Sequence, residues 1–454
     1  MPHISLNPAT NQLIQTHASW DAQRLEQALE KTHCAQQTWA QTSFALRAEA
    51  LRNVAIHLHA QRDQYATLIT QEMGKPLREA RAEVEKCAGV CDYYAQHTGE
   101  FLRAEPVASD AGKSYVAYYP LGAVLAVMPW NFPFWQVFRA AAPALMAGNA
   151  LVLKHAPNVP QCALAIEAIF RECGLPEGLV TTLMIEVEQV AEVIASPHIH
   201  AVTLTGSEAA GRKVAACAGQ HLKKCVLELG GSDPFIVLHD ADLELTVNMA
   251  VASRFLNCGQ SCIAAKRFIV VPQIADEFLH QLKTKVAALK VGDPLDDTTQ
   301  IGPMARLDLR DSLHRQVCDS IARGAVAATG CKPVEREGFF YQPSILDCVT
   351  AKTRAYHEEL FGPVATVIRA ASENDALRIA NETRFGLASS IWSNDVARAE
   401  QLAAHIQAGC TFINGMVKSD SRLPFGGVKA SGYGRELSRL GIHEFVNAKT
   451  VWIR

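Results

Sequence analysis

Short apolar runs alternate with helical segments from residue 122 to residue 228, and this alternation restricts the possible folds more than any other feature of the chain. Strands are expected at 122–128, 150–153, 179–184, 201–204 and 225–228. Helices are expected between them, at 134–146, 163–173, 189–195 and 208–218. Strands that are apolar throughout are typical of parallel sheets covered by helices on both faces. The pattern predicts a doubly wound α/β sheet whose ligand lies at the carboxyl ends of the strands.

A second α/β run begins near Ser232. Its strands are expected at 235–238, 268–271, near Tyr341, near Ala365, and at 388–392 and 410–413. Its helices are expected at 244–257, 275–289, 307–324, 373–383 and 396–405. Because a chain of 454 residues is too long for one hydrophobic core, the two runs predict two doubly wound α/β domains.

Outside these two runs, the N-terminal part of the chain is expected to be mainly helical and the C-terminal part mainly irregular. Helices are expected at 19–33, 43–74 and 76–94, and an extended stretch at 105–119. Residues 415–434 predict a loop-rich region, and 444–454 a helical turn followed by a strand.

Composition excludes several classes of function. The net charge of −3 does not indicate a nucleic acid or an anionic membrane as partner. The sequence contains no apolar run of membrane-spanning length and no signal-peptide pattern. Thirteen cysteines without metal-ligand spacing predict no metal site and a reducing compartment, so a cytoplasmic protein is expected.

One cysteine stands in an unusual setting. Cys262 follows Gly259 and Gln260 closely, and the basic pair Lys266 and Arg267 comes soon after. A nucleophilic thiol needs access and a positive or polar environment, and a preceding glycine allows a tight turn beside it. The alternative is a buried structural cysteine, which is the usual role of a free cysteine.

Two polar side chains follow predicted strands, where an open α/β sheet binds its ligand. Asn131, in a segment stiffened by Pro129 and Pro133, can donate an amide hydrogen to a developing oxyanion. Glu228, followed by Gly230 and a second glycine, can act as general base toward a water molecule. The alternatives are an asparagine bonded to its own loop and a glutamate in an ion pair.

Other loops suit a nucleotide. The turn containing Gly206 and Ser207 opens a helix, whose N-terminus favours phosphate, although the dinucleotide fingerprint Gly-x-Gly-x-x-Gly is not present and Ser207 can serve as an N-cap alone. Lys154 follows another strand and can reach ribose or phosphate, with a surface lysine as the alternative. Glu359 and Phe361 place a carboxylate and a ring in one loop.

Taken together and in this order, these segments resemble the aldehyde dehydrogenase superfamily along essentially the whole chain. The resemblance implies that Cys262 is the nucleophile, Glu228 the general base and Asn131 an oxyanion donor. It implies a thiohemiacetal, hydride loss to a nicotinamide, and a thioester that water hydrolyses to a carboxylic acid. The positions that match cofactor contacts in the family are Pro129, Trp130, Lys154, Pro157, Gly206, Ser207, Leu229, Glu359 and Phe361.

The resemblance also implies a domain division and an assembly. Residues 1–102 and 121–230 would form the dinucleotide-binding domain and 231–435 the catalytic domain. Residues 103–120 and 436–454 would form a β arm that pairs across subunits, in a homodimer or homotetramer. A non-catalytic protein that keeps the fold is the alternative, and it would require damage to the nucleophile, base or oxyanion donor.

Within the family the chain is most similar to bacterial succinate-semialdehyde dehydrogenases. Arg139 stands where that group carries a substrate-binding arginine, and a planar guanidinium suits a distal carboxylate; pairing with a structural acid is the alternative. Further substrate contacts are expected at Phe132, Ser419 and Phe425. A second arginine of many members is replaced by Leu256 here, so glutarate semialdehyde or an aliphatic aldehyde stays open as the substrate.

The identity of the nicotinamide cofactor depends on one position. Members that prefer NAD usually carry a glutamate three residues after the lysine, and this chain has Pro157 there. Without that carboxylate a 2′-phosphate is not repelled, but no added arginine requires one. We expect NAD or NADP, with a slight preference for NAD.

Overall fold

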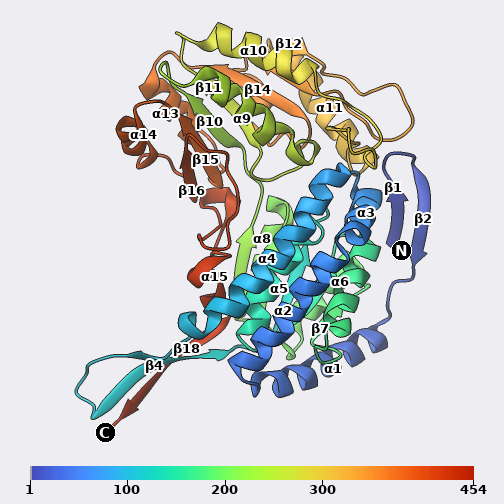
Figure 1. The fold of residues 1–454 in the computed structure, drawn as a ribbon, viewed down its shortest axis with the longest axis vertical. Coiled ribbons are helices and arrows are strands. Elements are labelled where there is room, and N and C mark those ends of the chain that lie inside the picture. Colours follow the sequence, from blue (N-terminus) through green and yellow to red (C-terminus); the bar gives the residue numbers. More distant parts are fainter. Residues whose placement is uncertain (1–2) are drawn as a thin grey trace.

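A computed structural model describes residues 3–454. Figure 1 shows two α/β lobes, an arm that projects from one of them, and an N-terminal hairpin at the opposite side. The first lobe contains a six-stranded sheet in the order β17-β9-β8-β5-β6-β7. Its parallel strands are β5 (Ala123–Met128), β6 (Ala150–His155), β7 (Val180–Thr182), β8 (Ile199–Thr205) and β9 (Lys224–Glu228). The expected doubly wound sheet is therefore present.

Helices cover this first sheet on both faces. Those between its strands are α5 (Trp135–Met146), α6 (Pro160–Glu172), the 3-10 turn η1 (Val187–Gln189), α7 (Val190–Ala195) and α8 (Glu208–Gln220). Four more precede the sheet in the chain, α1 (Ala22–Ala40), α2 (Phe44–Ala60), α3 (Arg62–Met73) and α4 (Leu77–Phe101). One large apolar core joins these helices to the strands.

The second lobe contains a seven-stranded sheet in the order β12-β13-β14-β11-β10-β15-β16. Its strands are β10 (Asp233–Val237), β11 (Ala265–Val270), β12 (Val326–Thr329), β13 (Ser344–Asp347), β14 (Val364–Arg369), β15 (Ala388–Trp392) and β16 (Cys410–Ile413). Only the edge pair β12–β13 is antiparallel. Its helices are α9 (Leu243–Phe255), the 3-10 turn η2 (Leu256–Gly259), α10 (Ala275–Ala287), α11 (Leu307–Ala322), α12 (Arg354–His357), α13 (Glu373–Asn381) and α14 (Val396–Ala403).

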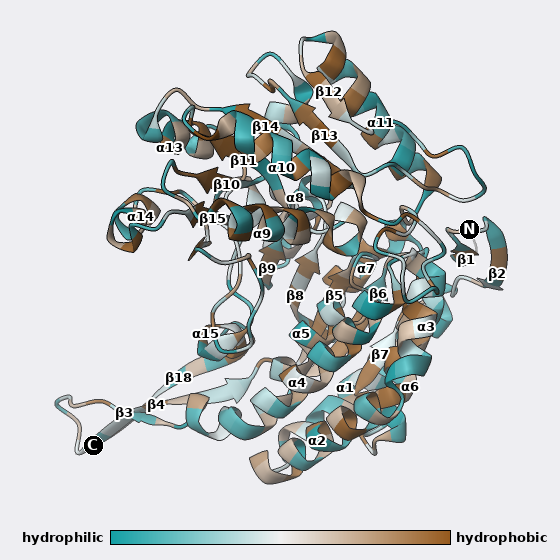
Figure 2. Cartoon of the chain, turned by 45° about the horizontal axis from the view of Figure 1, so that its top comes forward, coloured by the Kyte–Doolittle hydropathy of each residue, from teal (hydrophilic) through white to brown (hydrophobic). Residues whose placement is uncertain are grey.

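The core of the second lobe has one apolar cluster on each face of its sheet. Phe235 and Val237 belong to one cluster, whereas Ile236 and Leu238 belong to the other. Because neighbouring residues of a strand point to opposite faces, a strand that is buried on both sides is apolar at most of its positions. Figure 2 shows these strands as hydrophobic segments inside more hydrophilic helices.

The arm and the N-terminal hairpin lie outside both lobes. The arm is a three-stranded antiparallel sheet made of β3 (Glu105–Pro106), β4 (Lys113–Pro120) and β18 (Val446–Ile453). Before entering the arm, the chain adds β17 (Gly432–Tyr433) to β9, after the 3-10 turn η3 (Lys429–Ser431), and forms α15 (Ser438–His443). Strands β1 (His3–Asn7) and β2 (Gln12–His17) form the hairpin. None of the helices in residues 3–454 is long and apolar enough to cross a membrane.

Several expected helices end differently in the structure. Those expected at 19–33 and 76–94 extend to Ala40 and Phe101, and two others are interrupted or end early. The predicted helix 43–74 is broken at Gln61, which lies between α2 and α3. Its φ of −106° and ψ of 18° are not helical. No glycine or proline marks this break, so the sequence contains no signal for it. The predicted helix 244–257 stops at Phe255, because Asn257 and Cys258 adopt left-handed backbone conformations with φ of 57° and 55°. These two residues lead directly into the candidate site.

Candidate active site

The segment before Cys262 is held in an unusual backbone conformation. A Cβ atom at Gly259, where φ is 72°, would overlap the carbonyl group of Gly362, so only glycine fits. The backbone N–H of Asn257 donates a hydrogen bond of 2.6 Å to the Glu79 carboxylate on α4. Non-glycine residues with positive φ are costly and occur where the surroundings enforce them. The fold therefore fixes the loop that presents Cys262.

The Cys262 thiol lies beside a carboxylate. Glu228 ends β9, and its Oε2 accepts a hydrogen bond of 3.7 Å from the Cys262 Sγ. Burial raises the pKa of Glu228 to about 7, whereas burial and the neighbouring Glu228 charge raise the pKa of Cys262 well above its ordinary value. The resting thiol is thus neutral, and Glu228 is positioned to take its proton.

The side chain of Asn131 is fixed by the same loop. Its Nδ2 donates to the Gln260 carbonyl at 3.1 Å, and its backbone carbonyl accepts from Asn257 Nδ2 at 2.8 Å. An amide nitrogen carries two hydrogens, so the second stays available for an oxyanion beside Cys262. The three predicted catalytic groups come from different segments, and the structure brings them together.

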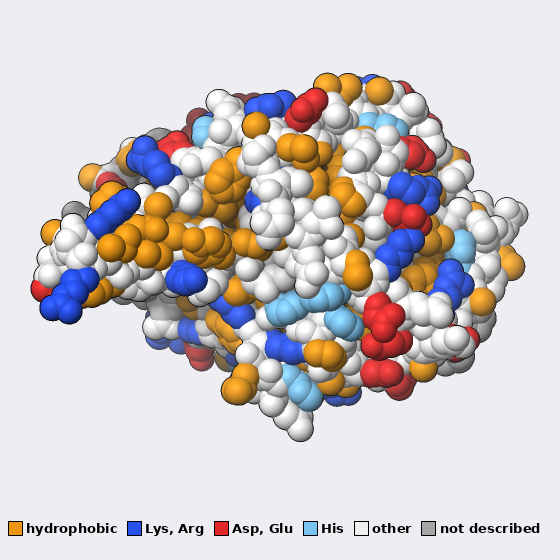
Figure 3. Space-filling view, turned by 90° about the horizontal axis from the view of Figure 1, so that it is seen from below, with side chains coloured by type: hydrophobic (Ala, Val, Ile, Leu, Met, Phe, Trp, Pro, Cys, Tyr) orange, Lys and Arg blue, Asp and Glu red, His pale blue; other side chains and the backbone are white. Residues whose placement is uncertain are grey.

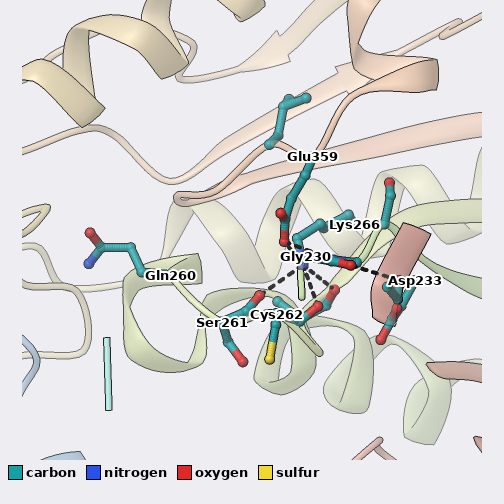
Figure 4. A network of polar contacts seen from close by, with 12 residues as sticks. Gly230, Asp233, Gln260, Ser261, Cys262, Lys266 and Glu359 are labelled. Atoms are coloured by element: carbon teal, nitrogen blue, oxygen red, sulfur yellow. Dashed lines mark hydrogen bonds and ion pairs between the residues drawn. The ribbon is translucent and has the colours of Figure 1, made fainter. Parts of the chain in front are cut away.

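A buried lysine links this loop to a second carboxylate (Figure 4). Lys266 Nζ donates to the backbone carbonyls of Ser261 at 2.8 Å and Cys262 at 2.7 Å, and lies 3.2 Å from Glu359 Oε1. Glu359 Oε1 also accepts from the Gly231 N–H at 3.2 Å. The sequence indicated only a positive charge near the thiol. The position of Lys266 between the Cys262 loop and Glu359 depends on the fold.

A cavity of about 260 Å³ opens on one side of Cys262 at the carboxyl ends of β5, β8 and β9. Seven of the nine predicted cofactor positions line it, namely Pro129, Trp130, Gly206, Ser207, Leu229, Glu359 and Phe361. Lys154 is a buried residue near the end of β6. Like Pro157, it does not line this cavity. Thr205 and Leu309 line it without having been predicted.

The residues that line this cavity suit a phosphate of a nicotinamide dinucleotide. A Cβ at Gly206 would meet only Leu204, at 3.6 Å, so the approach to the N-terminus of α8 is open. Ser207 caps that helix by accepting from the Ala210 N–H at 3.3 Å, and the remaining free N–H groups favour a phosphate. A Cβ at Gly230 would overlap the Glu359 carboxylate. The carboxylate can therefore approach the backbone here only because residue 230 is glycine.

A second cavity of about 360 Å³ lies on the other side of Cys262. All four predicted substrate positions line it: Phe132, Arg139, Ser419 and Phe425. It is also bordered by residues that the sequence analysis did not select, including Glu79, Lys86, Trp135 and Gln136. Those on α4 could have been found only by knowing that α4 packs against α5.

Arg139 forms ion pairs with two acidic side chains. Its Nη2 lies 2.6 Å from Glu436 Oε2 and 3.4 Å from Glu228 Oε2, and donates to the Thr205 hydroxyl at 3.1 Å. All three charged side chains are buried. This geometry matches the alternative expectation of an arginine paired with structural acids, although the guanidinium also borders the second cavity. Arg139 therefore links the predicted base Glu228 to Glu436.

These contacts define a class of protein. The Cys262 thiol donates a hydrogen bond to Glu228 and borders both cavities, and the Asn131 amide lines the cofactor-side cavity. Such a site suits a dehydrogenase that works through a covalent cysteine intermediate. The alternative of a fold with a damaged site does not agree with this geometry.

Comparison with known proteins identifies the family. The aldehyde dehydrogenase family model matches residues 3–451, and the chain belongs to this family. It is 48% identical over 449 residues to the succinate semialdehyde dehydrogenase [NAD(P)+] Sad of Escherichia coli, covering 99% of this chain and 97% of that protein. It is 50% identical over 453 residues to a probable succinate-semialdehyde dehydrogenase [NADP(+)] of Synechocystis, with 100% of both chains covered.

The fold is also that of the family. The crystal structure of succinic semialdehyde dehydrogenase from Streptococcus pyogenes in complex with NADP+ superposes with a TM-score of 0.97 at 38% identity, covering 99% of each chain. The expected architecture of two α/β units is thereby confirmed, and a nicotinamide cofactor, NAD or NADP, is supported. The slight preference for NAD finds no support, because these relatives are named for NADP(+) or for both cofactors.

Replacing Lys266 with methionine is expected to weaken cofactor binding. The change removes the partner that holds Glu359 in the cofactor cavity, and losing a hydrogen bond to a charged group costs about 1.5–3 kcal/mol. The KM for the nicotinamide cofactor should rise roughly tenfold or more by the same reasoning. Steady-state kinetics measure this, with Lys290→Met, at an exposed lysine paired with Asp296, as control. An unchanged cofactor KM would limit Lys266 to a structural role.

Proposed function

We propose that this protein oxidises succinate semialdehyde to succinate, with NADP as the hydride acceptor. The observation that carries the proposal is that Cys262 borders two cavities, one of which is lined by four basic side chains against two acidic ones, Glu79 and Glu83. The basic side chains are Arg78, Lys86, Arg139 and Lys418. A small aldehyde with a distal carboxylate complements this charge. The names of the relatives agree with it.

The first half of the reaction forms a bond to sulfur. Glu228 takes the thiol proton of Cys262, and the thiolate attacks the aldehyde carbon. The resulting oxyanion accepts hydrogen bonds from Asn131 Nδ2 and from the Cys262 backbone N–H. The nicotinamide, when bound, accepts the hydride that leaves this carbon, and the enzyme retains the acyl group as a thioester on Cys262.

The second half releases the acid. Glu228 first loses to solvent the proton that it took from the thiol, and then takes a proton from a water molecule. The resulting hydroxide adds to the thioester carbon, the C–S bond breaks, and the thiolate leaves. A carboxylate with a pKa of about 7 suits both transfers, because it exchanges protons readily near neutral pH.

The choice of NADP rests on the end of β6 and the residues that follow it. Lys154, His155, Ala156 and Pro157 include no carboxylate that would repel a 2′-phosphate. Two of the relatives are named for NADP(+) and one for both cofactors. NADP is therefore proposed in place of NAD.

A substrate and cofactor panel tests the proposal. Purified protein would be assayed with succinate semialdehyde, glutarate semialdehyde, butanal and propanal, each with NAD and with NADP. The expected result is the highest kcat/KM for succinate semialdehyde with NADP. A higher value for glutarate semialdehyde would transfer the proposal to that acid, and a higher value for the uncharged aldehydes would refute it.

We further propose that the arm assembles a homodimer or homotetramer in the cytoplasm. The arm exposes large apolar side chains, with Tyr119 exposed to 46% and Trp452 to 50%. Figure 3 shows hydrophobic side chains gathered toward the side of the molecule from which the arm projects. Exposed apolar surface of this kind is typical of an interface. The division into residues 1–102 with 121–230, 231–435, and 103–120 with 436–454 is kept as part of this proposal.

A further inference from the structure

Lys86 lies in the substrate-side cavity in an unusual environment. It is on α4, and its Nζ donates a hydrogen bond of 2.6 Å to the Ser419 hydroxyl, 333 residues later in the chain. The same ammonium group lies 4.1 Å from the centre of the Trp135 ring on α5. Lys86 is partly buried and borders the cavity that also contains the Cys262 thiol.

The other basic side chains of this cavity are either neutralised or exposed. Arg139 is paired with Glu436 and Glu228. Arg78 and Lys418 are exposed to solvent at the rim. Lys86 is less exposed than these two and forms no ion pair with any carboxylate of residues 3–454. It is thus a largely desolvated cation that lacks a counter-ion, and a buried charge of this kind is stabilised when an anion binds.

Ser419 adds a second donor at the same point. Its side chain is buried, and its oxygen accepts the hydrogen bond from Lys86. A hydroxyl that accepts through its oxygen still has its own hydrogen to donate. An ammonium and a hydroxyl side by side offer two hydrogens to the two oxygens of a carboxylate.

We propose that Lys86, together with Ser419, binds the distal carboxylate of the substrate and thereby selects semialdehydes over uncharged aldehydes. This inference rests on the proposed function and assigns the anion to a residue that the sequence comparison with the family did not indicate. Arg139 then stays paired with Glu436 and Glu228, while Lys86 supplies the charge that the substrate meets.

The charge of Lys86 depends on pH in a testable range. Burial, with a contribution from the Arg139 charge, lowers the pKa of Lys86 to about 8, while Cys87, Glu83 and Asp420 act in the opposite direction. Above about pH 8 the unliganded lysine is increasingly neutral. The ratio of KM for succinate semialdehyde to KM for butanal should therefore rise above this pH. Taking the ratio cancels the titration of Glu228, which acts on both substrates.

The decisive experiment replaces Lys86 in the full-length enzyme. Lys86→Met should lower kcat/KM for succinate semialdehyde by roughly 30-fold or more, mainly through KM, which is the scale for losing one partner of a desolvated charge pair. The value for butanal, which has the same chain length without the carboxylate, should stay within about twofold because its binding needs no cation. Lys86→Arg should restore much of the preference. Lys283→Met, at an exposed lysine on α10, is the matched control.

The outcomes separate this inference from the proposed function. If the wild-type enzyme does not prefer succinate semialdehyde to butanal, the proposed function fails. If the wild type shows that preference and Lys86→Met changes both substrates equally or neither, the role of Lys86 is overturned while the proposed function stands. Should the methionine variant not fold, Lys86→Gln keeps a donor toward Ser419 without the charge, and the same ratio of substrates decides.

Discussion

Replacing Cys262 with alanine is expected to abolish NADPH formation from any aldehyde. Within residues 3–454, the thiol is the only nucleophile that borders both cavities and contacts Glu228. Removing a nucleophile that works as a unit with its base lowers the rate by roughly four orders of magnitude or more. The absorbance of the reduced nicotinamide measures the loss.

The control for this variant is another thiol. Cys318 is exposed on α11, away from both cavities, so Cys318→Ala should keep normal activity. Turnover of Cys262→Ala at the rate of the wild type would remove the covalent mechanism and, with it, the assignment of the site.

Replacing Glu228 with glutamine is expected to divide the reaction into its two halves. A single burst of about one reduced nicotinamide per active site should remain, because thiolate formed by loss of its proton to solvent can still attack once. Steady turnover should then fall by roughly 10²–10⁴-fold, the contribution of a general base, because the thioester is not hydrolysed. Rapid mixing with absorbance detection resolves the burst from the steady state.

The pH dependence of the wild type provides a check on the same residue. A general base works only when it is ionised, so kcat should increase as the pH rises through about 7, the raised pKa of Glu228. The increase should be absent from the residual steady rate of Glu228→Gln. Full steady turnover by this variant without a burst would show that another group activates the water.

Much of the fold could be predicted from local patterns. The runs that became β5, β6, β8, β10 and β11 are mostly apolar because both faces of their sheets are covered, and their ends were expected to within three residues. The break at Gln61 could not be foreseen, since nothing in the local sequence disfavours a helix there. The left-handed backbone of Asn257 and Cys258 is likewise enforced by distant groups, among them Glu79.

The candidate site divides in a similar way. Cys262, Glu228 and Asn131 stand beside glycines or prolines at strand ends, which mark them in the sequence, and the structure places them together. Lys266 and Lys86 carry no such mark, because a lysine in a sequence is most simply a surface residue. Only the contacts of their ammonium groups with buried carbonyls, a ring and a distant hydroxyl give them a role.

The sequence alone determined the α/β architecture and marked Cys262, Glu228 and Asn131 as the candidate nucleophile, base and oxyanion donor, because those features depend on residue type and on the order of neighbours along the chain. The tertiary structure decided which charges face one another. It pairs Arg139 with Glu436 and Glu228, whereas Lys86, which borders the same cavity, forms no ion pair within residues 3–454. Such pairing acts over a few ångströms between residues up to several hundred positions apart, so folding alone sets it.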